Sequence, residues 1–241
     1  MERERPVSRE ESKVRTRASL IEAGVELVAE HPVGDALHHL RAADVAARAA
    51  LTHGAFYGHF GSQEGFRVAL LEHLFDPDRL VDQMAEVAAV TAGRDGVVDA
   101  IGAAMSTSLD LTVNDPAWKA SLALWCQADP DYDRLLEERY AGLTEELVGI
   151  LGEVLERASL YARPPLTIRT IAAALIALLD GSSIRSRLTP EAADDEVEGE
   201  AARKSTLFPL LVLALLSVLT TRDSDGPNLF EFIDEHLEAR D

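Results

Sequence analysis

A run of small, polar and aromatic side chains over residues 52–59 carries the clearest chemistry in the sequence. It reads Thr-His-Gly-Ala-Phe-Tyr-Gly-His, and the small residues Gly54 and Ala55 would leave one face of a helix low enough to enter a DNA major groove. On that face, the ring of His53 can donate to a guanine or phosphate acceptor, and Ala55 can contact a thymine methyl. Thr52 lies on the exposed turn before the helix. These residue types predict direct reading of base edges.

Helices that would position this run are predicted on both sides of it. Apolar residues spaced three and four apart indicate a helix over 14–31 and a short helix over 40–49. A third short helix starts after the N-cap Thr52 and extends through Tyr57, and a longer helix with a serine N-cap follows over 62–75. The side chains expected to hold this helix-turn-helix together are Val45, Ala46, Ala49, Leu51, Phe56 and Phe60.

The segment from Leu40 to Phe66 resembles the helix-turn-helix of the TetR (tetracycline-repressor) family of transcriptional regulators. The similarity covers residues 14–75 and implies that the hydroxyl of Tyr57 and the side chain of His59 point to DNA phosphates, which fix the register of a protein on the duplex. The positions that carry the resemblance are Val45-Ala46, Ala50, Leu51, Thr52, Gly54, Phe56-Tyr57, His59-Phe60 and Ser62-Gln63-Glu64.

Three positions near this motif need separate treatment. Arg41 begins the second helix, where its guanidinium can reach a phosphate or a guanine edge, although alignment through the following alanines puts Ala43 where the family often has arginine. Gln63 replaces the family's usual lysine at the start of the fourth helix and keeps a hydrogen-bond donor for phosphate. Ala50 replaces the usual turn glycine, which is tolerable only if the backbone avoids positive φ.

Charge is divided unevenly along the chain, whose formal net charge is −19. Residues 1–75 hold 9 Lys and Arg against 11 Asp and Glu, a net of −2, whereas residues 76–241 hold 14 against 31, a net of −17. Because phosphate binding needs cations, the N-terminal third is the part suited to nucleic acid. A basic N-terminal arm either adds to DNA affinity or is a solvated tail; its cations are Arg9, Lys13, Arg15 and Arg17.

The rest of the chain is also predicted to be helical, which makes the fold class all-α with about eleven helices and no convincing strand. An acidic stretch over 189–199 is expected to be a mobile loop. The predicted organisation is a flexible arm over 1–13, a helix-turn-helix DNA-binding domain over 14–61, and a linking helix with an effector-binding and dimerisation domain over 62–241. The expected C-terminal helices cover 80–90, 97–113, 117–128, 132–160, 167–187, 205–221 and 229–239.

An effector cavity is predicted from aromatic residues in a chain whose aromatic content is only 5%. Trp118, Leu122 and Trp125 follow one another at spacings of four and three, so they either line an apolar cavity or belong to the core. The segments 118–140 and 171–188 also resemble the effector domain of one TetR branch. Asp180 is either a polar contact in this cavity or part of a helix-weakening step. Weaker candidates for the cavity wall are Phe75, Met84, Met105 and Leu109.

The helices predicted over 167–187 and 205–221 are the most hydrophobic of the chain. An apolar run of about 16 residues is too short to be preferred as a membrane span, so no membrane partner is expected. In soluble protein such helices must be covered on every side. The resemblance implies that they pair with the same helices of a second copy as a four-helix bundle, which predicts a homodimer.

Other functional classes lack support in the sequence. No catalytic triad, phosphate loop or zinc-protease motif is present, so neither an enzyme nor a cofactor is expected. His31, His38 and His39 lack a spacing suited to a metal site, and the single Cys126 forms no disulfide within the chain. The N-terminus lacks an apolar stretch, which indicates a cytoplasmic protein.

The sequence therefore predicts a repressor that binds a palindromic operator on double-stranded DNA and is released by a small, largely apolar effector. The alternative is a helical ligand-binding or protein-interaction module that has lost its DNA affinity, consistent with Ala50, Gln63 and the acidic total charge.

Overall fold

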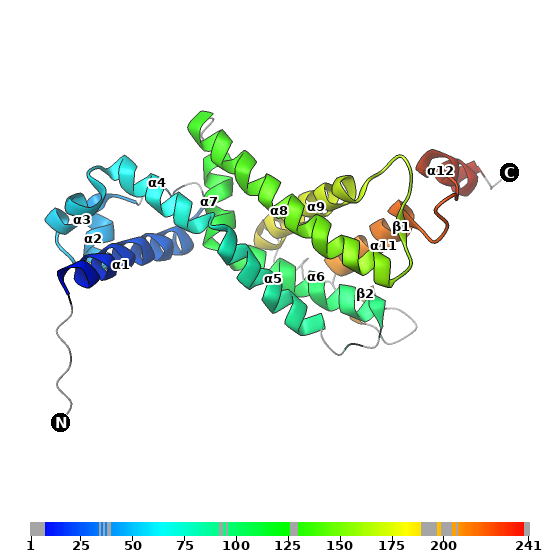
Figure 1. Ribbon diagram of the computed structural model, residues 1–241, viewed down its shortest axis with the longest axis horizontal. Helices are drawn as coiled ribbons and strands as arrows, with labels where there is room; N and C mark the ends of the chain where they lie inside the picture. The colour runs from blue at the N-terminus through cyan, green and yellow to red at the C-terminus, as the bar shows by residue number, and fades with distance from the viewer. Residues whose placement is uncertain are drawn as a thin grey trace, which may run out of the picture. The chain divides into compact units, whose positions relative to one another are not determined.

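The computed structural model describes residues 8–33, 35, 37, 40–91, 94, 96–125, 130–188, 197–198, 204–205 and 207–238. Within these residues the chain forms eleven helices and four strands of two residues each, so the predicted all-α class is confirmed, and strands are limited to two short pairs (Figure 1). The helices are α1 (Arg9–Glu30), α2 (Ala42–Arg48), α3 (His53–Phe60), α4 (Gln63–Leu74), α5 (Pro77–Thr91), α6 (Val97–Asn114), α7 (Pro116–Trp125), α8 (Pro130–Arg157), α9 (Ile168–Leu188), α11 (Leu207–Leu219) and α12 (Leu229–Glu238). The strands are β1 (Tyr161–Ala162), β2 (Val197–Glu198), β3 (Lys204–Ser205) and β4 (Thr220–Thr221).

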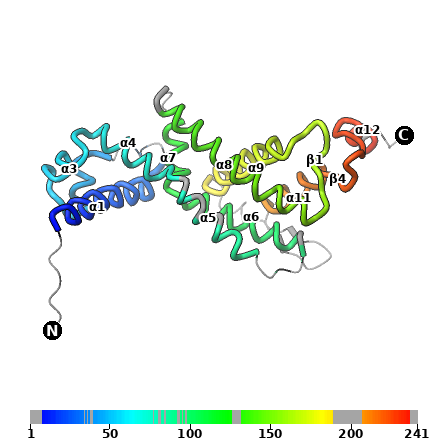
Figure 2. The backbone as a smooth tube through the Cα atoms, viewed as in Figure 1, coloured from blue at the N-terminus to red at the C-terminus, as the bar shows by residue number. Residues whose placement is uncertain are grey.

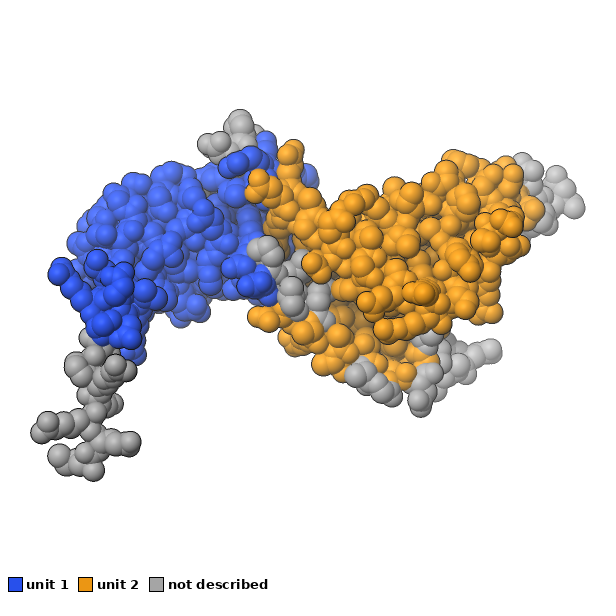
Figure 3. Space-filling view, in the orientation of Figure 1, with its two compact units in different colours: residues 1–79, 114–136 blue, residues 80–113, 137–241 orange. Residues whose placement is uncertain are grey.

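The chain divides into two compact units, coloured separately in Figure 3. The first unit comprises residues 1–79 and 114–136, and the second comprises residues 80–113 and 137–241. The first unit is therefore larger than the domain predicted over 14–61, because it also contains α4, α7 and the first residues of α8.

Helix α1 begins at Arg9, five residues before the predicted start at Val14. Ser8 is its N-cap: the main-chain N–H of Glu11 donates to the Ser8 hydroxyl at 3.1 Å, and the Ser8 N–H donates to the Glu11 carboxylate at 2.7 Å. This reciprocal pair satisfies two N–H groups that would otherwise lack a partner at the helix start. The prediction of a flexible arm over 1–13 is therefore wrong for Arg9 and Lys13, which lie on α1.

Close packing of α1 on α4 forms part of the first unit's core. A Cβ added to Gly24 of α1 would lie 2.7 Å from the Phe66 ring and 3.1 Å from Leu70, both on α4. Phe66 and Leu70 are fully buried. The glycine therefore allows the two helices to approach without displacing these core side chains.

The second unit has a separate apolar core. Leu151 and Leu155 of α8 pack with α9 and α11, and the buried side chains contributed by the latter two helices are Ile171, Leu175, Phe208, Val212 and Leu216. This agrees with the prediction that 167–187 and 205–221 form hydrophobic helices.

Arg163 fixes the chain around the end of α11. Its side chain is almost fully buried and donates three hydrogen bonds of 2.9–3.0 Å to main-chain carbonyl oxygens of Val218, Thr220 and Pro227. The guanidinium carbon also lies 4.0 Å from the centre of the Phe232 ring on α12. Arg163 directly follows β1, which pairs antiparallel with β4, so its side chain links this pair of strands to α12.

The acidic stretch predicted as a mobile loop lies mainly outside the described residues. Val197 and Glu198 within it form β2, which pairs antiparallel with β3. None of the helices among the described residues is long and apolar enough to cross a membrane.

Candidate nucleic-acid interface

The turn between α2 and α3 contains an alanine in the left-handed region. Ala50 has φ of 54°, so the expectation that this residue avoids positive φ is wrong. The reason is the helix ending: the N–H of Leu51 donates to the Ala46 carbonyl at 2.8 Å and the N–H of Ala50 donates to the Ala47 carbonyl at 3.1 Å. These two bonds define a Schellman C-cap, which requires a left-handed residue at this position. Leu51 then packs on the core, as predicted.

Both predicted serine and threonine caps are present. The Thr52 hydroxyl accepts from the N–H of Ala55 at 3.2 Å, and the Ser62 hydroxyl accepts from the N–H of Gly65 at 2.9 Å. Gly65 is required by the close approach of α3 and α4, because an added Cβ would lie 2.4 Å from the main-chain oxygen of Phe60. The start of α3 and the connection to α4 are thereby fixed.

Three aromatic rings hold α3 against the body of the first unit. Phe56 is fully buried, and its ring centre lies 5.5 Å from Phe60 and 5.0 Å from Phe66. Phe60 and Phe66 meet edge to face at 4.9 Å. Because these rings bury one side of α3 in the core, the opposite side is exposed to solvent, as the sequence pattern predicts.

The residues predicted to read DNA lie mainly on this solvent side. Thr52, His53 and Gly54 are exposed, and Tyr57 retains 42% of its surface exposure. The rings of His53 and Tyr57 meet edge to face, with centres 4.9 Å apart. Ala55, His59 and Gln63 are half-buried, and Arg41 is exposed at the N-cap of α2.

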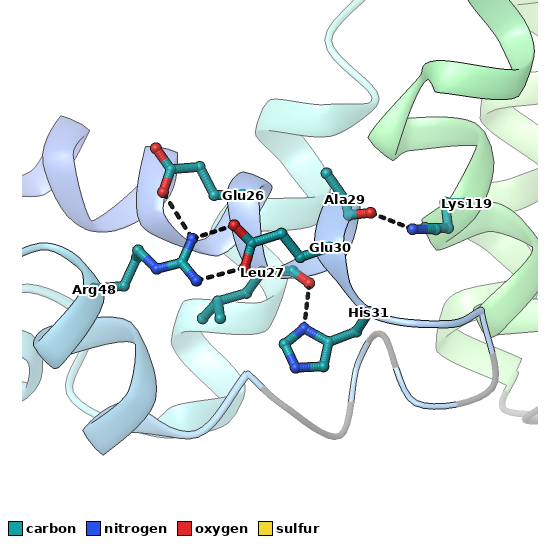
Figure 4. A network of polar contacts seen from close by, with 7 residues as sticks. All are labelled: Glu26, Leu27, Ala29, Glu30, His31, Arg48 and Lys119. Atoms are coloured by element: carbon teal, nitrogen blue, oxygen red, sulfur yellow. Dashed lines mark hydrogen bonds and ion pairs between the residues drawn. The ribbon is translucent and has the colours of Figure 1, made fainter.

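Other cations of the first unit are engaged by carboxylates. Arg48 donates to Glu30 at 2.7 Å and to Glu26 at 3.1 Å, which joins α2 to α1 (Figure 4). The hydrogen bond from Arg48 lowers the pKa of the Glu30 carboxyl. Arg67 lies 3.6 Å from the Glu64 carboxylate. These two arginines are therefore less available to phosphate.

Two long-range polar contacts within the first unit were not predicted. Lys119 of α7 is buried and its ammonium donates to the Ala29 carbonyl near the end of α1 (Figure 4). The hydroxyl of Tyr132 donates to the Glu64 carboxylate at 3.0 Å, and burial raises the pKa of this tyrosine. A lysine within the apolar segment 117–124 was the only sequence signal for the first contact.

The predicted effector residues are distributed over both units. Phe75, Trp118, Leu122 and Trp125 belong to the first unit, where Trp118 is buried and Trp125, the last residue of α7, is 72% exposed. Met105 and Leu109 pack against the core of the second unit, and the side chain of Met84 lies outside the described residues. Their joint participation in an effector cavity stays a prediction.

Asp180 has a partner on α8. The hydroxyl of Tyr140 donates to its carboxylate at 2.9 Å. Burial, followed by the charge of Asp180, raises the pKa of Tyr140.

No cluster of metal-ligating side chains occurs among the described residues. The ring of His31 contacts the Leu27 carbonyl at 2.8 Å, whereas His38, His39 and Cys126 lie outside the part of the chain that the structure describes.

Comparison with known proteins shows a similarity to a known family over part of the chain. Residues 98–206 match the family model described as the C-terminal domain of a BetI-type transcriptional repressor. Compared by sequence alone, the chain has no significant match among curated proteins.

Several solved structures share this fold at low sequence identity. Reduced NemR from E. coli has a TM-score of 0.60 and 18% identity, over 87% of this chain and 100% of NemR. A TetR-family transcriptional regulator from Cytophaga hutchinsonii also has a TM-score of 0.60 and 18% identity, over 91% and 100%. The regulator FadR from Bacillus subtilis, solved with stearoyl-CoA, has a TM-score of 0.55 and 16% identity, over 86% and 98%. The chain is therefore similar to TetR-family transcriptional regulators, by the family-model match over residues 98–206 and by a fold shared along nearly the whole chain.

Proposed function

We propose that this protein is a TetR-type transcriptional regulator, a cytoplasmic, homodimeric repressor that binds a palindromic operator through α3. The observation that carries the proposal is the two-sided character of α3: aromatic rings anchor one side, while Thr52, His53 and Tyr57 are exposed on the other. An exposed helix with small residues at its start suits the DNA major groove.

The proposed roles follow from the chemistry of each side chain. The Thr52 hydroxyl accepts from the Ala55 N–H and still has its own proton to donate to a base or phosphate. His53 and Ala55 would read base edges, with Gly54 allowing close approach. Phosphate contacts are assigned to Arg41, Tyr57, His59 and Gln63, which would set register without reading sequence.

A mobility-shift assay with the duplex that flanks the protein's own gene tests DNA binding. We expect sequence-specific binding that weakens steeply with salt. His53→Ala should change the preferred sequence, whereas the double variant Tyr57→Phe, His59→Ala should weaken binding to all duplexes alike. Wild-type affinity in the double variant would refute the proposed docking. Absence of binding at low salt would favour the alternative of a module without DNA affinity.

The proposed dimer interface lies on α9 and α11. Ile184, Leu188 and Leu211 keep 37%, 75% and 41% of their surface exposed, so these helices carry apolar surface that their own unit leaves uncovered. Leu179 and Leu213 are half-buried on the same two helices. Leu179→Arg or Leu213→Arg should give monomer or aggregate in light scattering, since a buried charge costs several kcal/mol. A clean dimer from both variants would place the interface elsewhere.

A small, largely apolar effector is proposed to release the DNA. The proposal is supported by FadR from B. subtilis, which shares this fold and was solved in complex with stearoyl-CoA, a ligand with a long apolar acyl chain. A tenfold to hundredfold loss of DNA affinity requires a coupling free energy of about 1.4–2.7 kcal/mol. If α7 contributes to the site, tryptophan fluorescence should respond to the effector and Trp125→Ala should raise the concentration needed for release. A response unaffected by substitution of both Trp118 and Trp125 would refute this assignment.

A further inference from the structure

We infer that Arg9, Lys13 and Arg17 form an ordered stripe on α1 that binds the phosphate backbone of duplex DNA beside α3. These three residues are called the α1 stripe. The inference rests on the proposed DNA-binding function and adds a second contact surface to it.

The spacing of the stripe puts its three cations on one side of the helix. Residues four apart differ by about 40° around an α-helix, so Arg9, Lys13 and Arg17 span about 80°. Continuing along the same side leads to the buried residues Leu20 and Gly24. The side of α1 that packs against the other helices thus becomes cationic towards the N-terminus.

The stripe is held in helical form. The capping box between Ser8 and Glu11 orders the first turn of α1. Lysine or arginine side chains on a formed helix lose less backbone entropy on binding than the same side chains on a disordered arm. This replaces the alternative of a solvated tail for these residues.

Arg17 connects the stripe to α3. Its guanidinium carbon lies 5.3 Å from the centre of the Phe60 ring, which ends α3 and follows His59. In Figure 2 the N-terminal part of α1 lies at the same end of the first unit as α3. The stripe therefore extends the cationic surface from the last turn of the proposed reading helix along α1.

The charges of the first unit favour this use of the stripe. Arg48 and Arg67 are engaged by carboxylates, whereas the structure shows no ion pair for the three described side chains of the stripe. Glu10 adjoins the stripe, whereas Glu11 lies about 200° from Arg9 around the helix, on the side away from the stripe, so the surface presents three cations beside one carboxylate. All three cations are solvent-exposed.

Arg15 provides a matched control on the same helix. It is two residues from Lys13, which places it about 200° around the helix, on the far side. Both side chains are exposed. Lys13→Gln and Arg15→Gln therefore remove the same charge from the same turn of α1, and only the first lies on the stripe.

The test measures the affinity of the full-length wild type and both variants for the flanking duplex and for an unrelated duplex of equal length, across about 50 to 200 mM salt. Each phosphate contact contributes about 0.9 to the slope of log affinity against log salt, so Lys13→Gln in a dimer should reduce the slope by about 1.8. Over that salt range the ratio of the wild-type affinity to the Lys13→Gln affinity should fall roughly tenfold on both duplexes. Arg15→Gln should keep the wild-type slope.

The outcomes separate this inference from the proposed function. If wild type binds but Lys13→Gln and Arg15→Gln change the slope equally, the stripe is not a specific contact surface and the inference is wrong. A wild type that binds neither duplex at low salt would overturn the DNA-binding proposal itself. Thermal unfolding of both variants should match wild type, because the two side chains are exposed and lack structural partners in the described part of the chain.

Discussion

The left-handed alanine in the turn between α2 and α3 allows a sharp test of the structure. Ala50 has φ of 54° and is exposed, at the point where the Schellman cap of α2 leads into α3. Ala50→Gly keeps both main-chain hydrogen bonds of the cap and removes only a solvent-exposed methyl group. The substitution should therefore stabilise the first unit.

The size of the effect follows from two opposing terms. An alanine in the left-handed region costs about 1–2 kcal/mol because its Cβ approaches the following carbonyl. A glycine raises the conformational entropy of the unfolded chain, which destabilises the fold by about 0.4–1 kcal/mol. The first term is larger, so we expect a net stabilisation of about 0.5–1 kcal/mol from Ala50→Gly.

Both tryptophans of the chain belong to the first unit, so their fluorescence during urea unfolding reports on this unit. Ala47→Gly is the control, since Ala47 is exposed in the last turn of α2 and its replacement should destabilise the first unit by about 0.5–1 kcal/mol. Opposite shifts of the two unfolding midpoints, with unchanged dependence on urea, are expected. Equal destabilisation by both substitutions would refute the cap geometry.

Three further predictions concern other parts of the fold. Gly65→Ala should destabilise the first unit by about 1–3 kcal/mol, because the new Cβ would meet a main-chain oxygen at 2.4 Å. In the same urea assay, Gly58→Ala should stabilise α3 by up to about 1 kcal/mol, because Gly58 has open space around it. Because the pKa of Tyr140 is raised, the folded state keeps a phenol proton that the unfolded chain loses above about pH 10. The free energy of unfolding should therefore fall above that pH by up to about 1.4 kcal/mol per pH unit, and unfolding followed by circular dichroism should show a shallower fall for Tyr140→Phe. Arg163→Met should lower the free energy of unfolding by several kcal/mol, since three main-chain carbonyl groups lose their donor. Arg169→Met, which breaks an exposed ion pair, should lower it by about 1 kcal/mol or less, and equal melting temperatures of the two variants would contradict the structural role of Arg163.

Local chemistry explains why much of the fold could be predicted from sequence. The caps at Thr52 and Ser62 use hydrogen bonds that reach only three residues along the chain, so residue type and spacing suffice to identify them. The helix periodicity depends on which face is buried, and that face is also encoded locally. The solvent-facing side of α3 could be predicted because Phe56 and Phe60 identify the opposite side as the one that packs on the core.

Positions that depend on distant partners could not be predicted in this way. The ammonium of Lys119 contacts Ala29, ninety residues earlier, and the pairing of Tyr132 with Glu64 spans sixty-eight residues. Nothing in the spacing of either pair indicates contact. These bonds join α7 to α1 and the start of α8 to α4 within the first unit, where α7 and the start of α8 also contribute side chains to the apolar core.

The sequence by itself determined the helical class, the caps and the two-sided α3, because each depends on interactions within one or two turns. Only the tertiary structure decided that Trp118 is buried while Trp125, on the same helical face, is 72% exposed at the end of α7. It also decided that Arg17 lies on the Phe60 ring and that Ala50 adopts positive φ. Burial and such contacts depend on which other helices cover a face, and that information is distributed over the whole chain.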